Sequence, residues 1–479
     1  MATSKSSSQT PRTPRSTGTL LLWSAIALSM LAAGGLPIQS NDLHVFLAMG
    51  ESMARSGELM EVESFTWTEE NKRFINGAWG FSYLSWQLYE LFGLAGLRIF
   101  TGLTVASSIA LLARAAVLRG ADVRSTAYAS LFTCLLLIQN VGVRAQSWVY
   151  PLFATLVWWR ARKRHPTLSI AVALGLGCAW ANLHGSFLVA YAVLGISACQ
   201  HWFSNRDWPS TKSDIVFALS FLAGTCIGPY GPELYVYVLQ NSTLPADRGL
   251  SEWEPVSLWS SMGIRLTVGV VIWGLLLLKK PRGLQLEEGL TLLLFGGLAL
   301  SASRFVSWFG LGTSVLLALR FHQNSTPSPS IPKTQFRRLC LLLAACWTVL
   351  LLRALWPKGD EMSAQTPTLA TQAIQESATT GRIFTPPEFG GYLRFELGEK
   401  WTVSSDMRVW IFGDAAWSLY PRLVQAPADW EEQLVQADVT HLLLIPDSFH
   451  QKLIPAVKAS ENWALLAEDN AGVAFQRSH

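Results

Sequence analysis

The chain has 479 residues, of which 50% are hydrophobic and only 15% are charged, and its mean hydropathy is +0.28. A soluble chain normally has about a quarter of its residues charged, so this composition indicates a membrane protein. The net charge of +4 is small, and basic residues do not form blocks with interleaved aromatics, which excludes a nucleic-acid partner.

The N-terminal segment 1–18 is basic and is followed by the first long apolar run, 19–37. A basic segment before an apolar run is also typical of a secretory signal peptide. The length of this run and the lack of a small-x-small cleavage site before Asp42 favour a retained first helix. Segment 1–18 is therefore expected to be a cytoplasmic tail.

Eleven apolar runs before about residue 357 have lengths that suit a membrane span, which needs about 30 Å at 1.5 Å per residue. They predict an α-helical polytopic membrane domain over 19–357. The runs cover residues 19–37, 96–116, 125–141, 147–161, 167–183, 186–200, 214–228, 257–278, 286–302, 304–320 and 339–356.

Positive charge alternates between the two sets of loops that join these runs. Because short cytoplasmic loops retain Lys and Arg, the richer set, which includes the N-terminus, is placed inside. An odd number of spans then puts the C-terminal part outside, and a bacterial inner membrane is the expected location. The richer set contains Arg114, Arg119, Arg124, Arg160, Arg162, Lys163, Arg164, Arg206, Lys212, Lys279, Lys280, Arg282, Arg320, Lys333, Arg337 and Arg338.

The first loop, 38–95, is long and is expected to be extracytoplasmic. Residues 43–54 place apolar side chains at helical spacing, and residues 81–94 form an aromatic-rich stretch slightly short for a span. Both fit helices that lie in the membrane interface. If residues 81–94 crossed the membrane instead, every later loop would change sides, and the charge distribution argues against that.

The C-terminal segment 358–479 predicts a small soluble α/β domain outside the membrane. Residues 381–397, 441–447 and 463–478 are typical of short strands, whereas 428–437 and 449–460 favour helices. A Pro/Ser-rich linker, 322–335, precedes the last apolar run. The domain has neither a phosphate-binding loop nor a GxSxG motif.

The cysteines all lie inside apolar runs, without a CxxC pair or a histidine at metal-ligand spacing. They indicate small buried apolar side chains rather than disulfides or zinc ligands. The sequence requires no cofactor, and the metal content of the site is left open because no ligand pattern supports a divalent ion. The six cysteines are Cys134, Cys178, Cys199, Cys226, Cys340 and Cys346.

Polar residues from six separate stretches fall at the outer ends of the predicted helices. Ionisable groups at membrane depth are costly and tend to mark functional pathways, so their gathering on one side predicts a site there. The residues are Asp42, Arg144, Gln146, His184, Tyr230, Glu252, Glu254 and Arg304.

These residue types suit sugar transfer from a lipid phosphate. An acceptor hydroxyl needs a carboxylate to take its proton as it attacks the anomeric carbon, and Asp42 is the candidate general base. The departing polyprenyl phosphate needs cations or donors where negative charge develops, and Arg144, Arg304 and His184 are candidates for that role. Apolar helices would supply a groove for the lipid tail.

Each of these residues also has a simpler structural interpretation. Asp42 could cap the helix that begins after it, and Arg144 and Arg304 could extend to lipid headgroups. His184 could be a hydrogen-bonded residue of helix packing.

The remaining candidates have simple interpretations too. Tyr230 lies between Pro and Gly as expected for a turn, and Glu252 and Glu254 could be solvated loop charges. Asp406 and Arg408 in the tail are expected to form a salt bridge rather than a second active site.

Several short motifs follow one another along the chain. They are Asp42-Leu43 with Gly50, Glu63 to Thr68, Asn76 to Trp79, Gly93 to Leu97, Arg144 to Gln146, Trp180 to Gly185, Gly228 to Gly231, Ser251 to Pro255, Gly381 to Leu393 and Asp406 to Arg408. In this order they resemble the motifs of multispanning prokaryotic glycosyltransferases of the GT-C type, related to the dolichyl-phosphate-mannose-dependent mannosyltransferases. The resemblance implies a GT-C helical bundle, a polyprenyl-phosphate sugar as donor, membrane lipids as surroundings and an extracytoplasmic acceptor.

The first motif departs from that family, in which a histidine stands where this chain has Phe46. His44, two residues earlier, is an accessory candidate for its role. The loss keeps open an inactive GT-C-like scaffold that assembles partners outside the membrane. A transporter is the third alternative, but transporters favour inverted repeats and polar residues near mid-membrane, and here the polar residues lie at helix ends.

Overall fold

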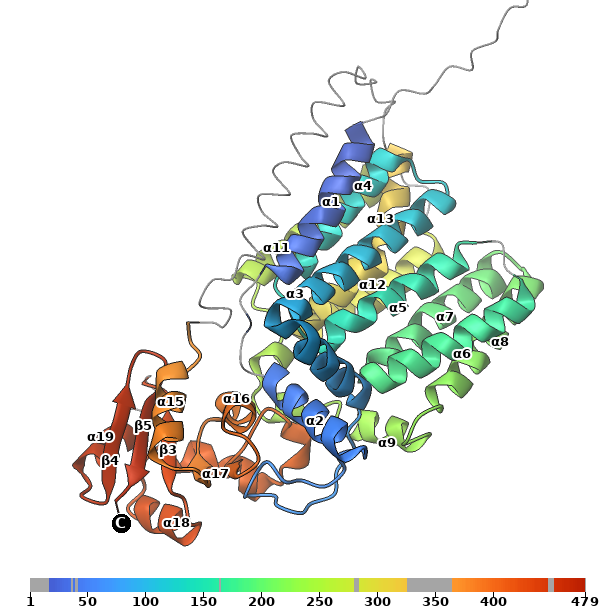
Figure 1. Ribbon diagram of the computed structural model, residues 1–479. Helices are drawn as coiled ribbons and strands as arrows, with labels where there is room; N and C mark the ends of the chain where they lie inside the picture. The colour runs from blue at the N-terminus through green and yellow to red at the C-terminus, as the bar shows by residue number, and fades with distance from the viewer. Residues whose placement is uncertain are drawn as a thin grey trace, which may run out of the picture.

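The computed structural model describes residues 17–35, 38, 42–162, 165–279, 284–324, 364–446 and 452–478. It consists of a helical bundle with a smaller α/β domain at one end (Figure 1). Residues 1–16 of the predicted tail 1–18, most of the linker 322–335 and the predicted last helix 339–356 lie outside the described residues, whereas Thr17 already belongs to the first helix.

The first ten predicted apolar runs all form helices. Five helical segments in the described part of the chain are long and apolar enough to cross a membrane, namely Trp79–Leu118, Pro166–Leu183, Gly185–Ser204, Ser261–Lys279 and Ser303–Gln323. The protein is therefore a multi-pass membrane protein, while the number of eleven spans stays a prediction. The bundle helices are α1 (Thr17–Gly34), α3 (Trp79–Leu118), α4 (Val123–Leu137), α5 (Ala145–Arg160), α6 (Pro166–Leu183), α7 (Leu188–Cys199), α8 (Trp208–Thr225), α11 (Ser261–Lys279), α12 (Leu286–Ser301) and α13 (Val306–Asn324).

Short helical turns join the bundle helices at both of its ends. They place the candidate site residues, because several of those residues lie in them or at their boundaries. These elements are η1 (Gly185–Phe187), η2 (Gln200–Ser204), α9 (Glu233–Gln240), α10 (Leu244–Asp247), η3 (Ser251–Trp253) and η4 (Ser303–Phe305).

The first loop contains the two helices expected from its sequence. α2 (Leu43–Ser56) buries one face, and the aromatic stretch forms the first part of α3. The two parts of α3 are separated by a kink at Gly93, whose φ of 61° and ψ of −163° are accessible to glycine but strained for other residues. The aromatic part therefore leaves the direction of the following transmembrane part (Figure 1).

Two glycines bring α6 and α8 into backbone contact. A Cβ added at Gly177 would lie 2.3 Å from the carbonyl oxygen of Phe221, and a Cβ added at Gly224 would lie 2.3 Å from the carbonyl oxygen of Leu174. Small residues allow such close approach in membrane bundles, where packing rather than the hydrophobic effect joins helices.

Replacing Gly177 with valine is therefore expected to separate α6 from α8 and to destabilise the protein, by about 1–3 kcal/mol for an overpacked contact. Thermal unfolding of the purified protein in detergent would measure the effect. Gly175, two residues before Gly177 and on another face of α6, has open space around its Cβ position and supplies the control variant Gly175→Val.

The C-terminal domain contains a five-stranded mixed sheet in the order β2-β1-β3-β5-β4. β1 runs parallel to β2 and β3, while β5 runs antiparallel to β3 and β4. The predicted strands over 441–447 and 463–478 are confirmed, as are the two predicted helices. The elements are α15 (Thr368–Ser377), β1 (Gly381–Phe384), α16 (Pro387–Leu397), β2 (Trp401–Val403), η5 (Val409–Ile411), α17 (Asp414–Leu423), α18 (Trp430–Gln436), β3 (His441–Leu444), α19 (Leu453–Ala459), β4 (Trp463–Glu468) and β5 (Val473–Arg477).

The prediction of strand over 381–397 is wrong beyond Phe384, because Pro387–Leu397 is helix α16. Pro387 occupies the first helical position, where its fixed φ suits a helix and its missing N–H costs nothing. Phe389 and Leu393, four residues apart, are both buried, which is a helical rather than an alternating pattern.

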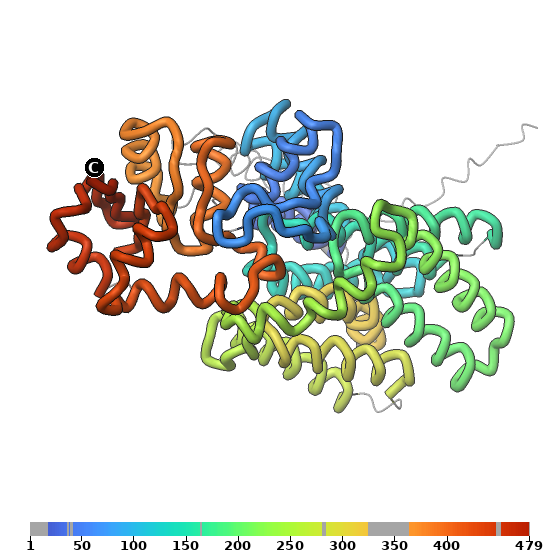
Figure 2. Tube along the Cα trace, turned by 90° about the horizontal axis from the view of Figure 1, so that it is seen from below, coloured from blue at the N-terminus to red at the C-terminus, as the bar shows by residue number. Residues whose placement is uncertain are grey.

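The C-terminal domain packs against the first loop at the end of the bundle where α2 lies (Figure 2). Thr66 forms a parallel bridge with Val403 at the end of β2, and Trp67 donates its indole N–H to the carbonyl of Ile383 at 3.2 Å. From the bundle side, Arg248 donates to the carbonyl of Phe412 at 2.7 Å. Loop 38–95 and the C-terminal domain are thus on the same side of the bundle.

Candidate functional site

Asp42 occupies the N-cap position of α2, yet its side chain makes no capping hydrogen bond. The capping interpretation predicts such a bond to a backbone N–H one turn into the helix. The half-buried carboxylate is therefore not used to begin the helix. This distinguishes Asp42 from Asp122, which caps α4 by accepting from Arg124 N and Ser125 N.

Charged groups from other elements act on Asp42. Burial raises the pKa of the Asp42 carboxyl above its ordinary 3.8, although the positive charge of Arg144 opposes this. Glu252 and Asp406 raise the pKa further, while Arg304 lowers it. Asp42 therefore lies within the electrostatic reach of two arginines from the bundle and of one carboxylate from the C-terminal domain.

Glu252 bridges the two arginines. Its Oε2 lies 2.8 Å from Arg144 Nη1 at the beginning of α5, and its Oε1 lies 3.3 Å from Arg304 Nη1 in η4. Glu252 itself lies in η3, and Ser303 Oγ donates to its backbone carbonyl at 3.0 Å. Three segments far apart in sequence thus hold two guanidinium groups on one carboxylate.

Neighbouring side chains orient Arg304 within this group. Gln146 accepts from Arg304 Nη2 at 3.4 Å, and its own amide donates to Tyr150 OH at 3.2 Å. The Arg304 guanidinium also lies over the Trp253 ring, 4.3 Å from its centroid. Tyr150 and Trp253 are not among the residues predicted from sequence. Tyr150 follows Gln146 by four positions and so shares its helical face, a spacing that could have indicated it.

His184 ends α6 and begins η1, where its Nδ1 accepts from Ser186 N at 3.1 Å. Burial, with a smaller contribution from Arg304, lowers the pKa of His184 to about 3. The imidazole is therefore neutral, with Nδ1 as acceptor and Nε2 left to carry the proton. His184 can act near Arg304 as a hydrogen-bond donor but not as a cation.

Three other candidates have different surroundings. Tyr230 OH accepts from Asn76 N at 3.1 Å, which ties the turn before α9 to the first loop. His44 is buried against the C-terminal domain, with its ring 5.1 Å from that of Tyr392. Glu254 is exposed, and its backbone carbonyl accepts from Ser303 N at 3.0 Å.

A second charged cluster joins the first loop to the C-terminal domain. Arg408 is fully buried, with its Nη2 2.6 Å from Asp406 Oδ2 and its Nη1 2.8 Å from Glu63 Oε2. The predicted Asp406–Arg408 salt bridge is confirmed, and Glu63 extends it across the domain boundary. Glu63 also accepts from Phe65 N at 2.7 Å and Thr66 N at 2.8 Å.

One half-buried carboxylate without a capping role thus lies within the electrostatic reach of two arginines at one end of the bundle, and a neutral imidazole lies within reach of Arg304. Such a group can accept a proton from a hydroxyl while the cations stabilise an anion close by. Among the described residues, no group of three or more His, Cys, Asp or Glu side chains could hold a metal ion.

Two solved structures of GT-C type membrane glycosyltransferases share the fold of this chain, in agreement with the motif resemblance. The archaeal oligosaccharyltransferase AglB from Archaeoglobus fulgidus, solved in complex with an inhibitory peptide and a dolichol-phosphate, superposes with a TM-score of 0.55 at 11% identity, over 89% of this chain and 69% of that one. ArnT from Cupriavidus metallidurans, solved bound to undecaprenyl phosphate, superposes with a TM-score of 0.55 at 13% identity, over 95% of this chain and 97% of that one. No family model and no curated protein sequence matches the chain.

Proposed function

We propose that the protein is a glycosyltransferase that moves a sugar from a polyprenyl-phosphate donor to an extracytoplasmic acceptor. Asp42 acts as the general base, and Arg144 and Arg304 receive the lipid phosphate. The single observation that carries the proposal is the Asp42 carboxylate, which makes no cap bond and lies within the field of both arginines. The fold shared with AglB and ArnT, which were solved with polyprenyl phosphates bound, supports the donor class.

Asp42 and the two arginines are sufficient to account for the proton and the charge that move in the reaction. The acceptor hydroxyl passes its proton to Asp42 as its oxygen bonds to the anomeric carbon, and the bond from that carbon to the phosphate oxygen breaks. The leaving polyprenyl phosphate gains negative charge, which guanidinium groups stabilise through charge-assisted hydrogen bonds. Gln146 keeps Arg304 in place, and His184 supplies a neutral donor beside it.

The test is direct transfer. Purified protein in lipid nanodiscs is incubated with a panel of polyprenyl-phosphate sugars and an envelope lipid fraction as acceptor, and the polyprenyl phosphate released is measured. Release with at least one sugar is expected. No release above the protein-free rate across the panel would favour the inactive-scaffold alternative. That alternative stays open because Phe46 stands where the family has a histidine, and the Phe46 ring packs against Phe81 with centroids 5.3 Å apart.

The pH dependence of kcat/KM should report the protonation of Asp42. A general base must be deprotonated, so activity falls as the pH drops through its pKa. Because burial raises the pKa of Asp42, the acid limb of the profile is expected above the ordinary value of 3.8. A rate constant for transfer that stays level down to pH 4, with the protein folded, would contradict the assignment.

Glu252 forms ion pairs with both Arg144 and Arg304, so we expect it to compete with the donor phosphate for them. Glu252→Gln removes the negative charge that pairs with the two arginines. Undecaprenyl phosphate should then bind about tenfold more tightly, a gain of about 1.4 kcal/mol in binding free energy. Equilibrium binding in nanodiscs would measure this. Glu254→Gln, an exposed carboxylate two residues away, is the matched control and should change nothing. Weaker binding in Glu252→Gln would instead mean that Glu252 organises the arginines for the phosphate.

A further inference from the structure

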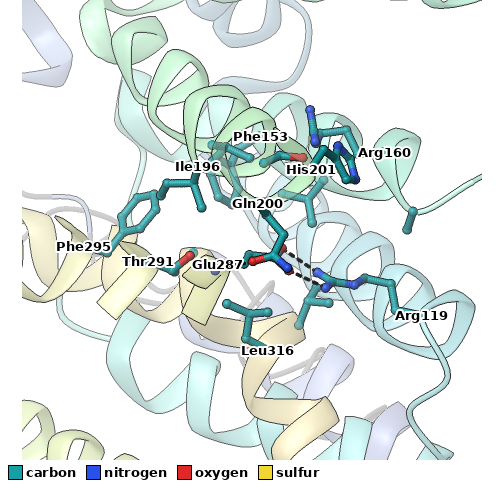
Figure 3. Close-up of a pocket in the computed structure, with 16 residues that line it drawn as sticks. Arg119, Phe153, Arg160, Ile196, Gln200, His201, Glu287, Thr291, Phe295 and Leu316 are labelled. Atoms are coloured by element: carbon teal, nitrogen blue, oxygen red, sulfur yellow. Dashed lines mark hydrogen bonds and ion pairs between the residues drawn. The ribbon is translucent and has the colours of Figure 1, made fainter. Parts of the chain in front are cut away.

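A second region of interest is a cavity of about 250 Å³, shown with its lining side chains in Figure 3. It lies at the other end of the bundle from Asp42. α5 connects the two regions, because Arg144 and Gln146 stand at its first turn and Val157 and Arg160 at its last. α12 and α13 do the same, with Arg304 at their junction and the cavity toward their far ends. The cavity is therefore separate from the proposed transfer site.

Polar side chains gather along one side of this cavity. Arg119 holds Glu287 in a bidentate pair at 2.9 and 2.7 Å, drawn as dashed lines in Figure 3. Arg160 reaches the fully buried Asp214 at 3.0 Å. His201 also faces Asp214, with Nδ1 2.9 Å from Oδ2, while its Nε2 has no hydrogen bond within the described part of the chain.

The opposite side of the cavity is apolar. Phe153 from α5, Ile196 from α7, Phe295 from α12 and Leu316 from α13 form it. Ile196 lies on a helix that is mostly exposed to the surroundings of the bundle, since only 22% of the Gly185–Ser204 span is buried. One apolar and one charged wall beside the bilayer suit an amphiphile rather than a fully polar solute.

Exposed aromatic side chains indicate at which level of the membrane the cavity lies. η2, a single π-helical turn, supplies Gln200 and His201 to the cavity and directs Trp202 and Phe203 outward, where they are 45% and 60% exposed. Trp208, 53% exposed, packs against Trp202 with ring centroids 5.2 Å apart. Exposed Trp side chains settle at the level of lipid headgroups, and π-helical turns recur at functional sites.

We propose that this cavity binds one anionic phospholipid, with its phosphate between Arg119 and His201 and an acyl chain along Phe295 and Ile196. Arg119 offers a planar set of donors that matches a phosphate, and His201, which lines the cavity and is held by Asp214 at Nδ1, leaves Nε2 as its second polar atom for the phosphate. Basic pockets between helices on the cytoplasmic side of a membrane recognise anionic headgroups in this way. The site does not depend on the proposed sugar transfer.

The experiment is lipid retention by the full-length protein. After stepwise delipidation in neutral detergent, native mass spectrometry follows titration with phosphatidylglycerol, phosphatidylcholine or soluble glycerol phosphate. One saturable phosphatidylglycerol is expected, with phosphatidylcholine and glycerol phosphate at least about tenfold weaker. Binding of glycerol phosphate at equal strength would overturn the lipid assignment, and equal binding of phosphatidylcholine would overturn the anionic one.

Two variants test whether the lipid binds in the cavity. Arg119→Gln removes the headgroup donor from a partly exposed pair, and Ile196→Trp fills the apolar wall; each should weaken the bound lipid about tenfold. Arg124→Gln is the control, because Arg124 lies at the same end of the bundle but bonds to Tyr128 outside the cavity. Unchanged retention in both variants, or no saturable lipid in the wild type, would overturn the proposal, and unfolding temperatures would show that the variants are folded.

Discussion

Replacing Asp42 with asparagine is expected to lower sugar transfer by a factor of about 10²–10⁴, the usual contribution of a positioned general base. Asparagine has nearly the same shape but cannot accept the proton. Because the Asp42 side chain makes no cap bond, the unfolding temperature should stay close to that of the wild type. The measurement is single-turnover release of polyprenyl phosphate in nanodiscs.

Asp122→Asn is the matched control. Asp122 also stands at a helix N-cap, but at the far end of the bundle and with its carboxylate used for capping. Asparagine is an equally good cap, so this variant should keep both fold and transfer. If Asp42→Asn transferred sugar at the wild-type rate, the proposed base would be wrong, whereas the lipid-binding role of the arginines could still be tested through Glu252→Gln.

Local sequence signals were sufficient for most of the helices. Long apolar runs have no alternative in a bilayer, since every backbone group must find its hydrogen bond within the helix. The amphipathic helix α2 was equally predictable from its spacing of apolar residues. The kink at Gly93 was not, because a glycine inside a helix is compatible with several backbone conformations and the surrounding packing selects among them.

Helix α16 shows where short-range patterns fail. Residues 381–397 mix a true strand with a helix, and within so few residues apolar content alone cannot separate the two. The proline pair before Phe389 was the decisive local signal. Gly391, whose Cβ would lie 2.8 Å from the Cβ of Val45, has a tertiary reason to be small that only the contact with α2 reveals.

The candidate site was predictable in part. The charge distribution of the loops placed Asp42, Arg144 and Arg304 at one end of the bundle, because helices that alternate in direction return the chain to the same surface. The partner that links both arginines, Glu252, could not be identified, since Glu252 and Glu254 are equivalent in sequence. The separate surroundings of Tyr230 and His44 likewise depend on tertiary packing.

The contact between the C-terminal domain and α2 depends on Arg408. It is the only cation that the described contacts place between Glu63 and Asp406, and all three side chains are almost completely buried. Its Nη1 also approaches Met49 Sδ at 4.0 Å, and its guanidinium lies 4.9 Å from the centroid of Phe65. Arg408 thus connects the C-terminal domain to α2, the helix that follows Asp42.

Arg408→Met is therefore expected to destabilise the protein by about 3–5 kcal/mol, because two buried carboxylates would lose their counter-ion. Thermal unfolding followed by tryptophan fluorescence, with limited proteolysis of the C-terminal domain, measures the loss. Adding Glu63→Gln and Asp406→Asn should recover most of it, because the amides remove the charges yet keep the oxygens that accept from Thr66 N and Arg408 N. A single variant as stable as the wild type, or a triple variant no more stable than the single one, would show that the cluster does not hold the domain through its charges.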